Sequence, residues 1–342
     1  MHDLVVAGGG PVGLTTALYA ARAGLDVVVR EPRRGVIDKA CGEGLMPAAV
    51  EGLGELGVRL GGHPISGIRY VDPRHAVDAA FRRGPGRGVA RTELHAALLE
   101  TVRVAGVAVS HERVVDVVDR GSHLEVDGSP ARYLVAADGL HSPLRRRLGL
   151  DAPVRAPRRF GQRCHLATAP WTSYVEVHWA PVGEAYVTPL GPDCVGVAVL
   201  SSRRRPLTEL LSGITTLADR LDGVVPGDVR GAGPLRQRSR SRVSGRVLLV
   251  GDAAGYVDAL TGEGIAIGLA QARAAVAAVL ADAPTSYETA WRRITRRHDL
   301  LTHGLLAATR FPAIRSRIVP SAAALPRVFE AAVDQLARPA LA

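Results

Sequence analysis

The sequence predicts an α/β protein in which a βαβ unit on a mostly parallel sheet is combined with an antiparallel sheet and a helical C-terminus. An apolar run at residues 4–7 precedes a glycine-rich turn, a helical segment at 14–23 and a second apolar run at 26–31. This order is typical of two parallel strands joined by a helix. Apolar and polar residues alternate between 160 and 200, which indicates antiparallel strands with one exposed face. The last hundred residues are predicted to be helices interrupted by prolines.

Composition indicates a globular protein of 342 residues, with 47% hydrophobic and 22% charged residues. No secretory signal is recognised and no apolar run reaches the length of a membrane span, so we expect a cytoplasmic protein. The three cysteines lack the spacing of a disulfide framework or a redox pair. The net charge of +10 comes almost entirely from arginine, but aromatic residues make up only 4% of the chain. Because nucleic-acid binding uses aromatic stacking between basic residues, we expect no nucleic-acid partner.

A dinucleotide-binding turn is predicted at the start of the first helix. The segment GGGPVG at 8–13 follows the pattern G-x-G-x-x-G between a strand and a helix, and Glu31 ends the next strand. Gly8 permits the tight turn, Gly10 lets backbone amides approach a pyrophosphate at the helix N-terminus, and Gly13 lets the helix lie close to the strand. The Glu31 carboxylate would accept ribose hydroxyls. The predicted cofactor-binding residues of this Rossmann-like unit are Gly8, Gly10, Pro11, Val12, Gly13, Arg30 and Glu31.

Two further motifs point to FAD as the dinucleotide. Asp138-Gly139, after a buried apolar run, resembles the DG motif of flavoprotein aromatic hydroxylases, in which the turn contacts the flavin and a transient nicotinamide. Gly251-Asp252 resembles their GD motif, whose aspartate binds the ribityl hydroxyls. With the turn at 8–13, the chain resembles the p-hydroxybenzoate-hydroxylase-like superfamily. The resemblance implies a Rossmann-like FAD domain, a substrate domain roofed by a sheet, FAD as cofactor, and NADH or NADPH as a transient reductant.

The resemblance also implies further contacts with the cofactor. Arg91 matches the family arginine that opens a helix leaning on the cofactor. The glycine-rich segment 251–268 leads into an alanine-rich helix, whose N-terminus would point at the flavin ring where negative charge gathers on reduction. The residues implied here are Arg91, Asp138, Asp252, Gly262, Glu263, Gly264 and Ile265. The helix dipole alone favours an acid in a first turn, so Glu263 is assigned no catalytic role.

Within the superfamily, two segments resemble the geranylgeranyl-reductase family, which saturates prenyl double bonds. They are KACGEGLMP at 39–47 and DALTGEGI at 258–265. That family also carries an aromatic segment, P-x-x-Y-x-W-x-F-P, over its substrate pocket, whereas residues 184–191 here read EAYVTPLG. Monooxygenases of natural-product pathways share the first two segments, so this departure favours oxygenation. The W-x-W-x-I-P segment of flavin halogenases is also missing from the sequence.

The sequence therefore predicts an FAD-dependent, NAD(P)H-consuming monooxygenase. It would use O2 to hydroxylate or epoxidise an apolar aromatic or terpenoid small molecule of secondary metabolism, through a flavin C4a-hydroperoxide. One alternative is a flavin-dependent reductase of prenyl-chain double bonds, and a second is a non-catalytic flavin-binding module. No general acid or base is assigned, and Cys41, His178 and Tyr186 are the candidates for the substrate pocket. No metal site is expected, because the histidines lack ligand spacing.

The domains are predicted to be interleaved along the chain. The FAD domain would comprise residues 1–65, 88–150 and 240–290, the substrate domain 66–87 and 151–239, and the C-terminal helices 291–342. In the C-terminal helices, Arg310, Arg315 and Arg317 stand beside leucines and isoleucines. We expect these helices to cover the substrate pocket rather than to lie on a membrane surface.

Overall fold

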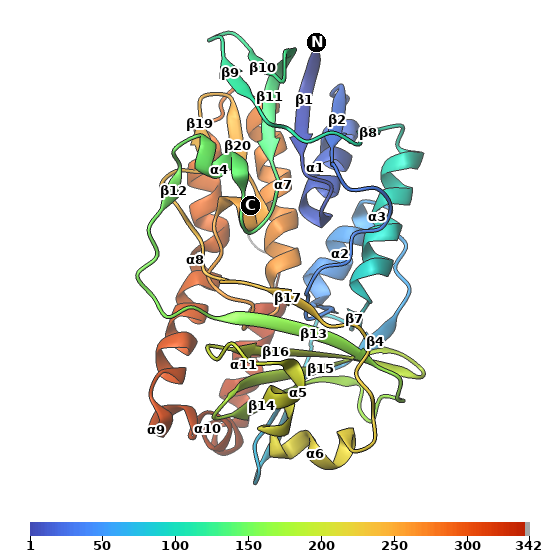
Figure 1. The fold of residues 1–342 in the computed structure, drawn as a ribbon, viewed down its shortest axis with the longest axis vertical. Helices are drawn as coiled ribbons and strands as arrows, with labels where there is room; N and C mark the ends of the chain where they lie inside the picture. The colour runs from blue at the N-terminus through green and yellow to red at the C-terminus, as the bar shows by residue number, and fades with distance from the viewer. Residues whose placement is uncertain (339–342) are drawn as a thin grey trace.

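The computed structural model describes residues 1–338, apart from the side chain of Asp219. Two large sheets lie at opposite ends of the molecule, and the long helix α8 (Ser286–Thr309) runs along one side from the first toward the second (Figure 1). The predicted fold class is confirmed: a parallel sheet, an antiparallel sheet and a helical C-terminus are all present. The last four residues of the predicted C-terminal segment lie outside the described residues.

The first sheet has the strand order β19-β20-β11-β1-β2-β8, with β9 and β10 forming an antiparallel hairpin beside β11. Its central strands pair in parallel. Alternate residues of β1 enter two different cores, so the strand is apolar throughout rather than alternating. The bounds are β1 His2–Ala7, β2 Val27–Arg30, β8 Ala108–Ser110, β9 Val117–Asp119, β10 Leu124–Val126, β11 Ser129–Ala136, β19 Val243–Ser244 and β20 Val247–Leu249.

Four helices and the first half of α8 pack in the core on one face of this sheet, and the short helix α4 packs on the other. The four are α1 (Pro11–Arg22), α2 (Pro47–Glu55), α3 (Arg91–Val104) and α7 (Gly264–Leu280), and α4 spans Pro143–Arg147. Helix α1 begins three residues earlier than predicted. Proline lacks an amide hydrogen, which costs nothing at the first helical position, so Pro11 suits this start.

The second sheet has the order β17-β13-β16-β15-β14-β5-β6 and is antiparallel except where β14 pairs with β5. Helices α5 (Leu207–Ser212) and α6 (Thr215–Leu221) pack on one face. A small three-stranded sheet of β3 (Gly44–Leu45), β7 (Gly86–Gly88) and β4 (His63–Ile65) lies beside it, and β12 (Asp151–Ala152) pairs with β18 (Arg238–Ser239). The large strands are β5 Gly67–Val71, β6 Ala76–Ala80, β13 Phe160–Leu166, β14 Tyr174–Ala180, β15 Gly183–Gly191, β16 Cys194–Ser201 and β17 Arg230–Ala232.

The C-terminal helices lie against the other face of the second sheet. Helices α10 (Ile318–Ala324) and α11 (Pro326–Ala337) pack on β5 and β6, and α9 (Pro312–Arg315) joins α10 to the end of α8. Val319, Phe329 and Val333 bring their side chains into the core on this face. The C-terminal helices and the segment around Leu260 therefore enclose one apolar cluster with the sheet.

We expect the substitution Tyr287→Phe to destabilise the fold by about 1–2 kcal/mol. The fully buried Tyr287 hydroxyl donates to the Leu249 carbonyl at 2.9 Å and so joins α8 to β20. Without it, a buried acceptor loses its donor. The free energy of unfolding in urea measures the effect. Tyr19→Phe is the control, because the Tyr19 hydroxyl makes no hydrogen bond within residues 1–338. Equal stability of the two variants would contradict the prediction.

Candidate functional site

The glycine turn joins β1 to the N-terminus of α1. A Cβ atom at Gly13 would lie 1.9 Å from the Gly8 carbonyl oxygen, so α1 can approach the turn only because residue 13 is glycine. A Cβ atom at Gly10 would meet nothing within 4 Å. Pro11 then begins the helix, followed by Val12. The turn thus leaves open backbone at a helix N-terminus, which suits an anionic phosphate group.

Glu31 ends β2 beside this turn. Its carboxylate accepts hydrogen bonds from the Gly9 amide (2.8 Å) and from Arg33 Nε (2.7 Å). Burial opposes ionisation, but the hydrogen bonds from Arg33 and Gly9 outweigh it and lower the pKa of Glu31 to about 2. Arg30 is directed elsewhere, because its guanidinium pairs with Asp127 at 3.0 Å. The structure therefore brings Arg33, which the sequence analysis does not select, to the Glu31 carboxylate, while the guanidinium of Arg30, predicted to bind the cofactor, lies against Asp127.

His95 on α3 also supports the glycine turn, although the sequence analysis does not select it. Its Nδ1 accepts a hydrogen bond from the Ile37 amide at 3.2 Å, so Nε2 carries the proton and donates to the Gly9 carbonyl at 2.7 Å. Burial lowers the pKa of His95, which keeps the ring neutral. A single histidine among the leucines of a helix carries no sequence signal for this contact.

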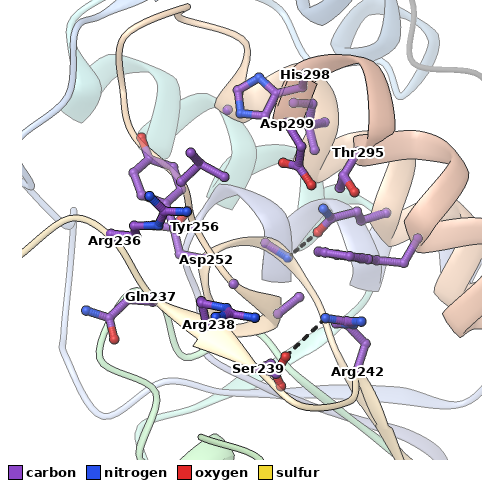
Figure 2. Close-up of a pocket in the computed structure, with 18 of the residues that line it drawn as sticks. Arg236, Gln237, Arg238, Ser239, Arg242, Asp252, Tyr256, Thr295, His298 and Asp299 are labelled. Atoms are coloured by element: carbon purple, nitrogen blue, oxygen red, sulfur yellow. Dashed lines mark hydrogen bonds between the residues drawn. The ribbon is translucent and has the colours of Figure 1, made fainter. Parts of the chain in front are cut away.

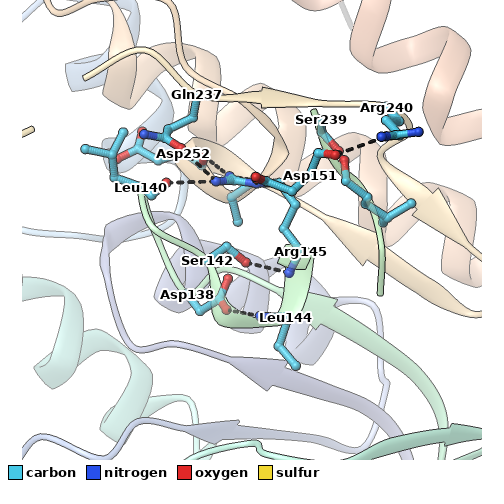
Figure 3. A network of polar contacts seen from close by, with 12 residues as sticks. Asp138, Leu140, Ser142, Leu144, Arg145, Asp151, Gln237, Ser239, Arg240 and Asp252 are labelled. Atoms are coloured by element: carbon cyan, nitrogen blue, oxygen red, sulfur yellow. Dashed lines mark hydrogen bonds and ion pairs between the residues drawn. The ribbon is translucent and has the colours of Figure 1, made fainter. Parts of the chain in front are cut away.

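Arg145 links the DG turn to the GD turn (Figure 3). Arg145 lies in α4, the short helix that follows the DG turn, and its side chain is almost fully buried. The guanidinium donates to the Leu140 carbonyl (3.2 Å), to the Ala253 carbonyl (3.0 Å) and to the Asp252 carbonyl (3.3 Å), while Nε pairs with Asp151 at 2.8 Å. One side chain therefore holds together two turns that lie more than 100 residues apart in the sequence.

Charged side chains from three different segments gather around Asp252. Burial raises the pKa of Asp252, although Lys39, Arg91 and Arg145 oppose this rise. Within residues 1–338, Nη1 of Arg91 and Oδ1 of Asp138 are buried without a hydrogen-bond partner. Buried polar atoms are normally paired, so these two atoms fit a polar ligand such as the predicted FAD, which offers hydroxyl and phosphate groups. Burial also lowers the pKa of Arg91 and raises that of Asp138.

Cys41 and Glu43 lie in the loop between the glycine turn and the second sheet. Burial raises the pKa of the Cys41 thiol although Arg91 lies near it, so the thiol is a weak nucleophile. The Glu43 carboxylate is fully buried; it lies 2.8 Å from His165 Nε2 and 3.5 Å from Arg163 Nε, and it accepts the Arg91 amide at 2.8 Å. Glu43 has a φ of 59°, which is rare for a residue with a side chain. These contacts fasten the loop to β13.

The segment 258–265 ends at the N-terminus of α7, where Glu263 occupies the N-cap position. The Glu263 carboxylate is engaged by His298 Nδ1 of α8 at 3.0 Å. Gly262 and Gly264 are exposed, with no atom near the place of a Cβ, and Ile265 is half-buried. The backbone at Gly262 and Gly264 is therefore open, while the Glu263 carboxylate is held by His298.

The apolar cluster, which includes Val177, Trp179, Leu260, Phe329 and Val333, lies between the second sheet, this segment and the C-terminal helices. The Tyr186 hydroxyl donates to the Leu260 carbonyl at 2.9 Å. The ring centroid of Tyr70 lies 5.4 Å from that of Trp179 and 4.5 Å from that of Phe329. Aromatic side chains from three elements therefore meet here, none of which the sequence motifs reveal.

The prediction that His178 and Tyr186 face the same pocket is wrong for His178. In the register of β14 and β15, Val177 lies opposite Tyr186, whereas His178 lies opposite Ala185 on the other face of the sheet. His178 Nδ1 is 2.8 Å from the Thr216 hydroxyl, beneath α6. Side chains alternate between the two faces of a strand, so a displacement of one residue reverses the face.

A buried ion triad borders the apolar cluster. Arg159 Nε lies 3.0 Å from Asp258 Oδ2, and Arg159 Nη2 lies 2.5 Å from Glu184 Oε2. Asp258 is buried, and its Oδ1 has no hydrogen-bond partner in the described part of the chain. Burial raises the pKa of Asp258, Arg159 opposes the rise, and Glu184 adds to it. Asp258 belongs to the DALTGEGI segment, but no sequence pattern joins it to Arg159.

A cavity of about 440 Å³ lies behind the GD turn and borders Asp252 and Gly264. Figure 2 shows Arg236 and Arg238 across this cavity from the side chains of α8. Arg236 donates to His303 Nε2 at 2.5 Å. Within residues 1–338, neither Arg236 nor Arg238 has a carboxylate within 4.0 Å, so this wall of the cavity is positively charged.

The comparisons with known proteins agree with the geometry. Residues 1–211 match the family described as FAD binding domain. The chain belongs to this FAD-binding family. Menaquinone reductase of Mycobacterium tuberculosis is 36% identical over 313 residues, which cover 80% of this chain and 75% of that protein. Digeranylgeranylglycerophospholipid reductase 1 of Methanopyrus kandleri is 31% identical, with 77% and 76% covered.

The solved structure of p-nitrophenol 4-monooxygenase from Pseudomonas putida has a TM-score of 0.78 to this chain at 20% identity. The match covers 98% of this chain and 95% of that one, and it shows the shared fold alone. The predicted recognition is confirmed: the chain is an FAD-dependent oxidoreductase of the p-hydroxybenzoate-hydroxylase-like superfamily, close to its geranylgeranyl-reductase-type branch.

For this FAD-binding protein, we expect Arg91→Met to weaken FAD binding while leaving the apoprotein equally or more stable. Arg91 is buried with an unpaired Nη1, so its removal relieves an unsatisfied cation in the apoprotein and deletes a donor to the cofactor. Flavin fluorescence titration and thermal unfolding of the apoprotein measure the two effects. Arg103→Met, at an exposed position of the same helix, is the control. Unchanged FAD affinity in Arg91→Met would refute the prediction.

Proposed function

We propose that this FAD-dependent oxidoreductase reduces a double bond in the prenyl chain of a lipid. The substrates named for the menaquinone and digeranylgeranylglycerophospholipid reductases carry prenyl chains. The observation that carries the proposal is the apolar cluster beside the segment 258–265, next to which the buried acid Asp258 has an unpaired oxygen. Saturation of an apolar alkene needs a dry site and a proton, and this arrangement offers both.

Aromatic residues from separate elements support a pocket for a prenyl chain. The sequence lacks the aromatic segment that the reductase family carries. This absence is the reason why the sequence analysis favours oxygenation over reduction. In the structure, Tyr70 from β5, Trp179 from β14 and Phe329 from α11 pack against one another in the apolar cluster, so aromatic side chains reach this place from other parts of the sequence. The missing segment is therefore a weaker argument against reduction than the sequence alone suggests.

In this proposal the glycine turn and Glu31 hold the pyrophosphate and a ribose of FAD, and Asp252 holds the ribityl chain. Arg91 and Asp138 offer their unpaired atoms to the same ligand. Bound FAD supplies hydride-transfer chemistry, from a nicotinamide to the substrate. In its protonated form, which burial favours, the Asp258 carboxyl would give its proton from Oδ1 to the alkene carbon that does not receive the hydride. The apolar cluster keeps water away from that carbon.

We assign the arginine-lined cavity to the nicotinamide reductant. Arg236 and Arg238, which have no carboxylate partner within residues 1–338, suit the phosphate groups of NADH or NADPH, because guanidinium forks bind phosphate oxygens well. The cavity borders Asp252 and Gly264, so a reductant held there would lie next to the proposed flavin site.

Monooxygenation of an apolar small molecule with O2 is the second candidate. The observation that favours it is the segment 184–191, where the tryptophan and phenylalanine of the reductase family are both missing. The same apolar cluster would accept an aromatic or terpenoid substrate. The two candidates require the same cofactor and differ in the atoms that the substrate gains.

The mass of the product separates the two candidates. We expect a prenylated quinone or a geranylgeranyl lipid to gain two hydrogen atoms when it is incubated with the holoenzyme and NADH or NADPH without O2. Mass spectrometry of the extracted lipid measures this change. Gain of one oxygen atom, only in the presence of O2, would establish the monooxygenase instead. If the nicotinamide reduces the flavin but neither lipid changes in mass, the reductase proposal is refuted.

We expect Asp258→Asn to slow the reduction of the lipid by about 10²-fold or more, because the amide keeps the size of the side chain but donates no acidic proton. The reduction of FAD by nicotinamide should stay unchanged. Burial raises the pKa of Asp258, so the wild-type rate should fall as the pH rises through that value, and the variant should lack this dependence. Stopped-flow flavin absorbance at several pH values measures both steps.

Asp193→Asn is the matched control for this experiment, because Asp193 is an exposed residue in the turn between β15 and β16. Thermal unfolding of each variant shows whether the fold is intact. An Asp258→Asn variant that keeps the wild-type rate and pH profile would remove Asp258 from the mechanism and leave the reaction itself untouched.

A further inference from the structure

The C-terminal helices and their joints expose four large apolar side chains to solvent. Phe311 is 60% exposed, Ile314 49%, Leu325 58% and Val328 62%. Large apolar residues of this kind are usually scattered singly over a protein surface, whereas these four fall within 18 residues on three consecutive short helices and their joints. We call the surface formed by residues 310–328 the C-terminal surface.

The C-terminal surface is also positively charged. Residues 305–329 contain four arginines, Arg310, Arg315, Arg317 and Arg327, and no aspartate or glutamate. Within the described chain, none of the four has a carboxylate within 4.0 Å. The nearest acid along the sequence, Glu330, is already paired with Arg82 at 3.0 Å. The exposed apolar residues are therefore interspersed along the sequence with arginines that pair with no carboxylate of the described residues.

The opposite side of the same helices covers the apolar cluster. Val319, Phe329 and Val333 are buried against the second sheet, while Leu325 and Val328 face outward. A lid that only covered a pocket would need apolar residues on its inner side alone. The expectation that these helices act as a lid thus explains their inner side and leaves their outer side without a role.

We propose that the C-terminal surface docks on an anionic lipid bilayer. The unpaired arginines would lie against lipid phosphates, and Phe311, Ile314, Leu325 and Val328 would enter the boundary between headgroups and acyl chains. None of the described helices is long and apolar enough to cross a bilayer, so the contact is peripheral. The charge pattern selects an anionic lipid surface over a second copy of this chain, whose net charge of +10 would repel it.

Docking goes beyond the proposed function and does not depend on it. A bilayer contact brings the lid and the apolar cluster beneath it next to the lipid phase, whichever reaction the flavin supports. Vesicle binding is measured without turnover, and turnover can be measured on a detergent-solubilised lipid without vesicles. Failure of one proposal is therefore distinguishable from failure of the other.

Flotation of the FAD-loaded protein with vesicles tests the proposal. We expect binding to vesicles of phosphatidylcholine mixed with phosphatidylglycerol, much weaker binding to phosphatidylcholine alone, and release by added salt, because salt screens the charges. The double variant Phe311→Ser, Ile314→Ser should partition about tenfold less, since two apolar side chains no longer enter the interface. Arg315→Gln, Arg317→Gln should reduce binding to the anionic vesicles and make it less sensitive to salt.

Two control variants match these changes elsewhere on the surface. Val225→Ser alters an apolar residue that is 82% exposed, and Arg155→Gln, Arg158→Gln removes the same charge from exposed positions. Both should bind vesicles as the wild type does. Loss of binding in the charge control, equal binding to neutral and anionic vesicles, or no binding at all would overturn the proposal. So would a dimer in gel filtration that Phe311→Ser, Ile314→Ser abolishes, because the surface would then belong to a second copy.

Discussion

The buried guanidinium of Arg145 is the contact on which the arrangement of the site depends. It binds carbonyl groups of both the DG turn and the GD turn, and its charge is met by Asp151. A guanidinium has five donors in a fixed plane, so it can satisfy several carbonyls that would otherwise be buried without partners. The parallel pairing of β11 with β20 places Asp138 and Asp252 at neighbouring strand ends, and the Arg145 side chain joins the two turns that follow those strands.

Local sequence patterns predicted the elements around the cofactor because their causes are local. The glycine turn needs backbone freedom at a few adjacent positions, and the helix at Arg91–Val104 has its apolar residues at helical spacing. The strand before Asp138 and the strand before Gly251 are apolar throughout because both faces of the parallel sheet are covered. Each of these features can be recognised within about 15 residues of sequence.

The substrate side could not be predicted in the same way, because its causes are contacts between distant segments. Arg159, Glu184 and Asp258 form a triad only after three segments have met, and each residue alone is an ordinary surface charge. Tyr70 and Phe329 are separated by more than 250 residues. His178 was assigned to the wrong face because the alternation in a strand gives two phases, and only the pairing with β15 selects one.

The Glu43 loop has a thermodynamic consequence for ligands of the two sheets. Contacts of the Glu43 carboxylate with His165 and Arg163 tie this loop to β13, and Arg91, whose amide donates to the same carboxylate, lies on the cofactor side. If a substrate shifts β13 and thereby changes the affinity for the flavin, the flavin must change the affinity for that substrate by the same factor. The coupling free energy between flavin binding and substrate binding would then depend on the contacts of the Glu43 carboxylate. Glu43 itself has a left-handed backbone conformation.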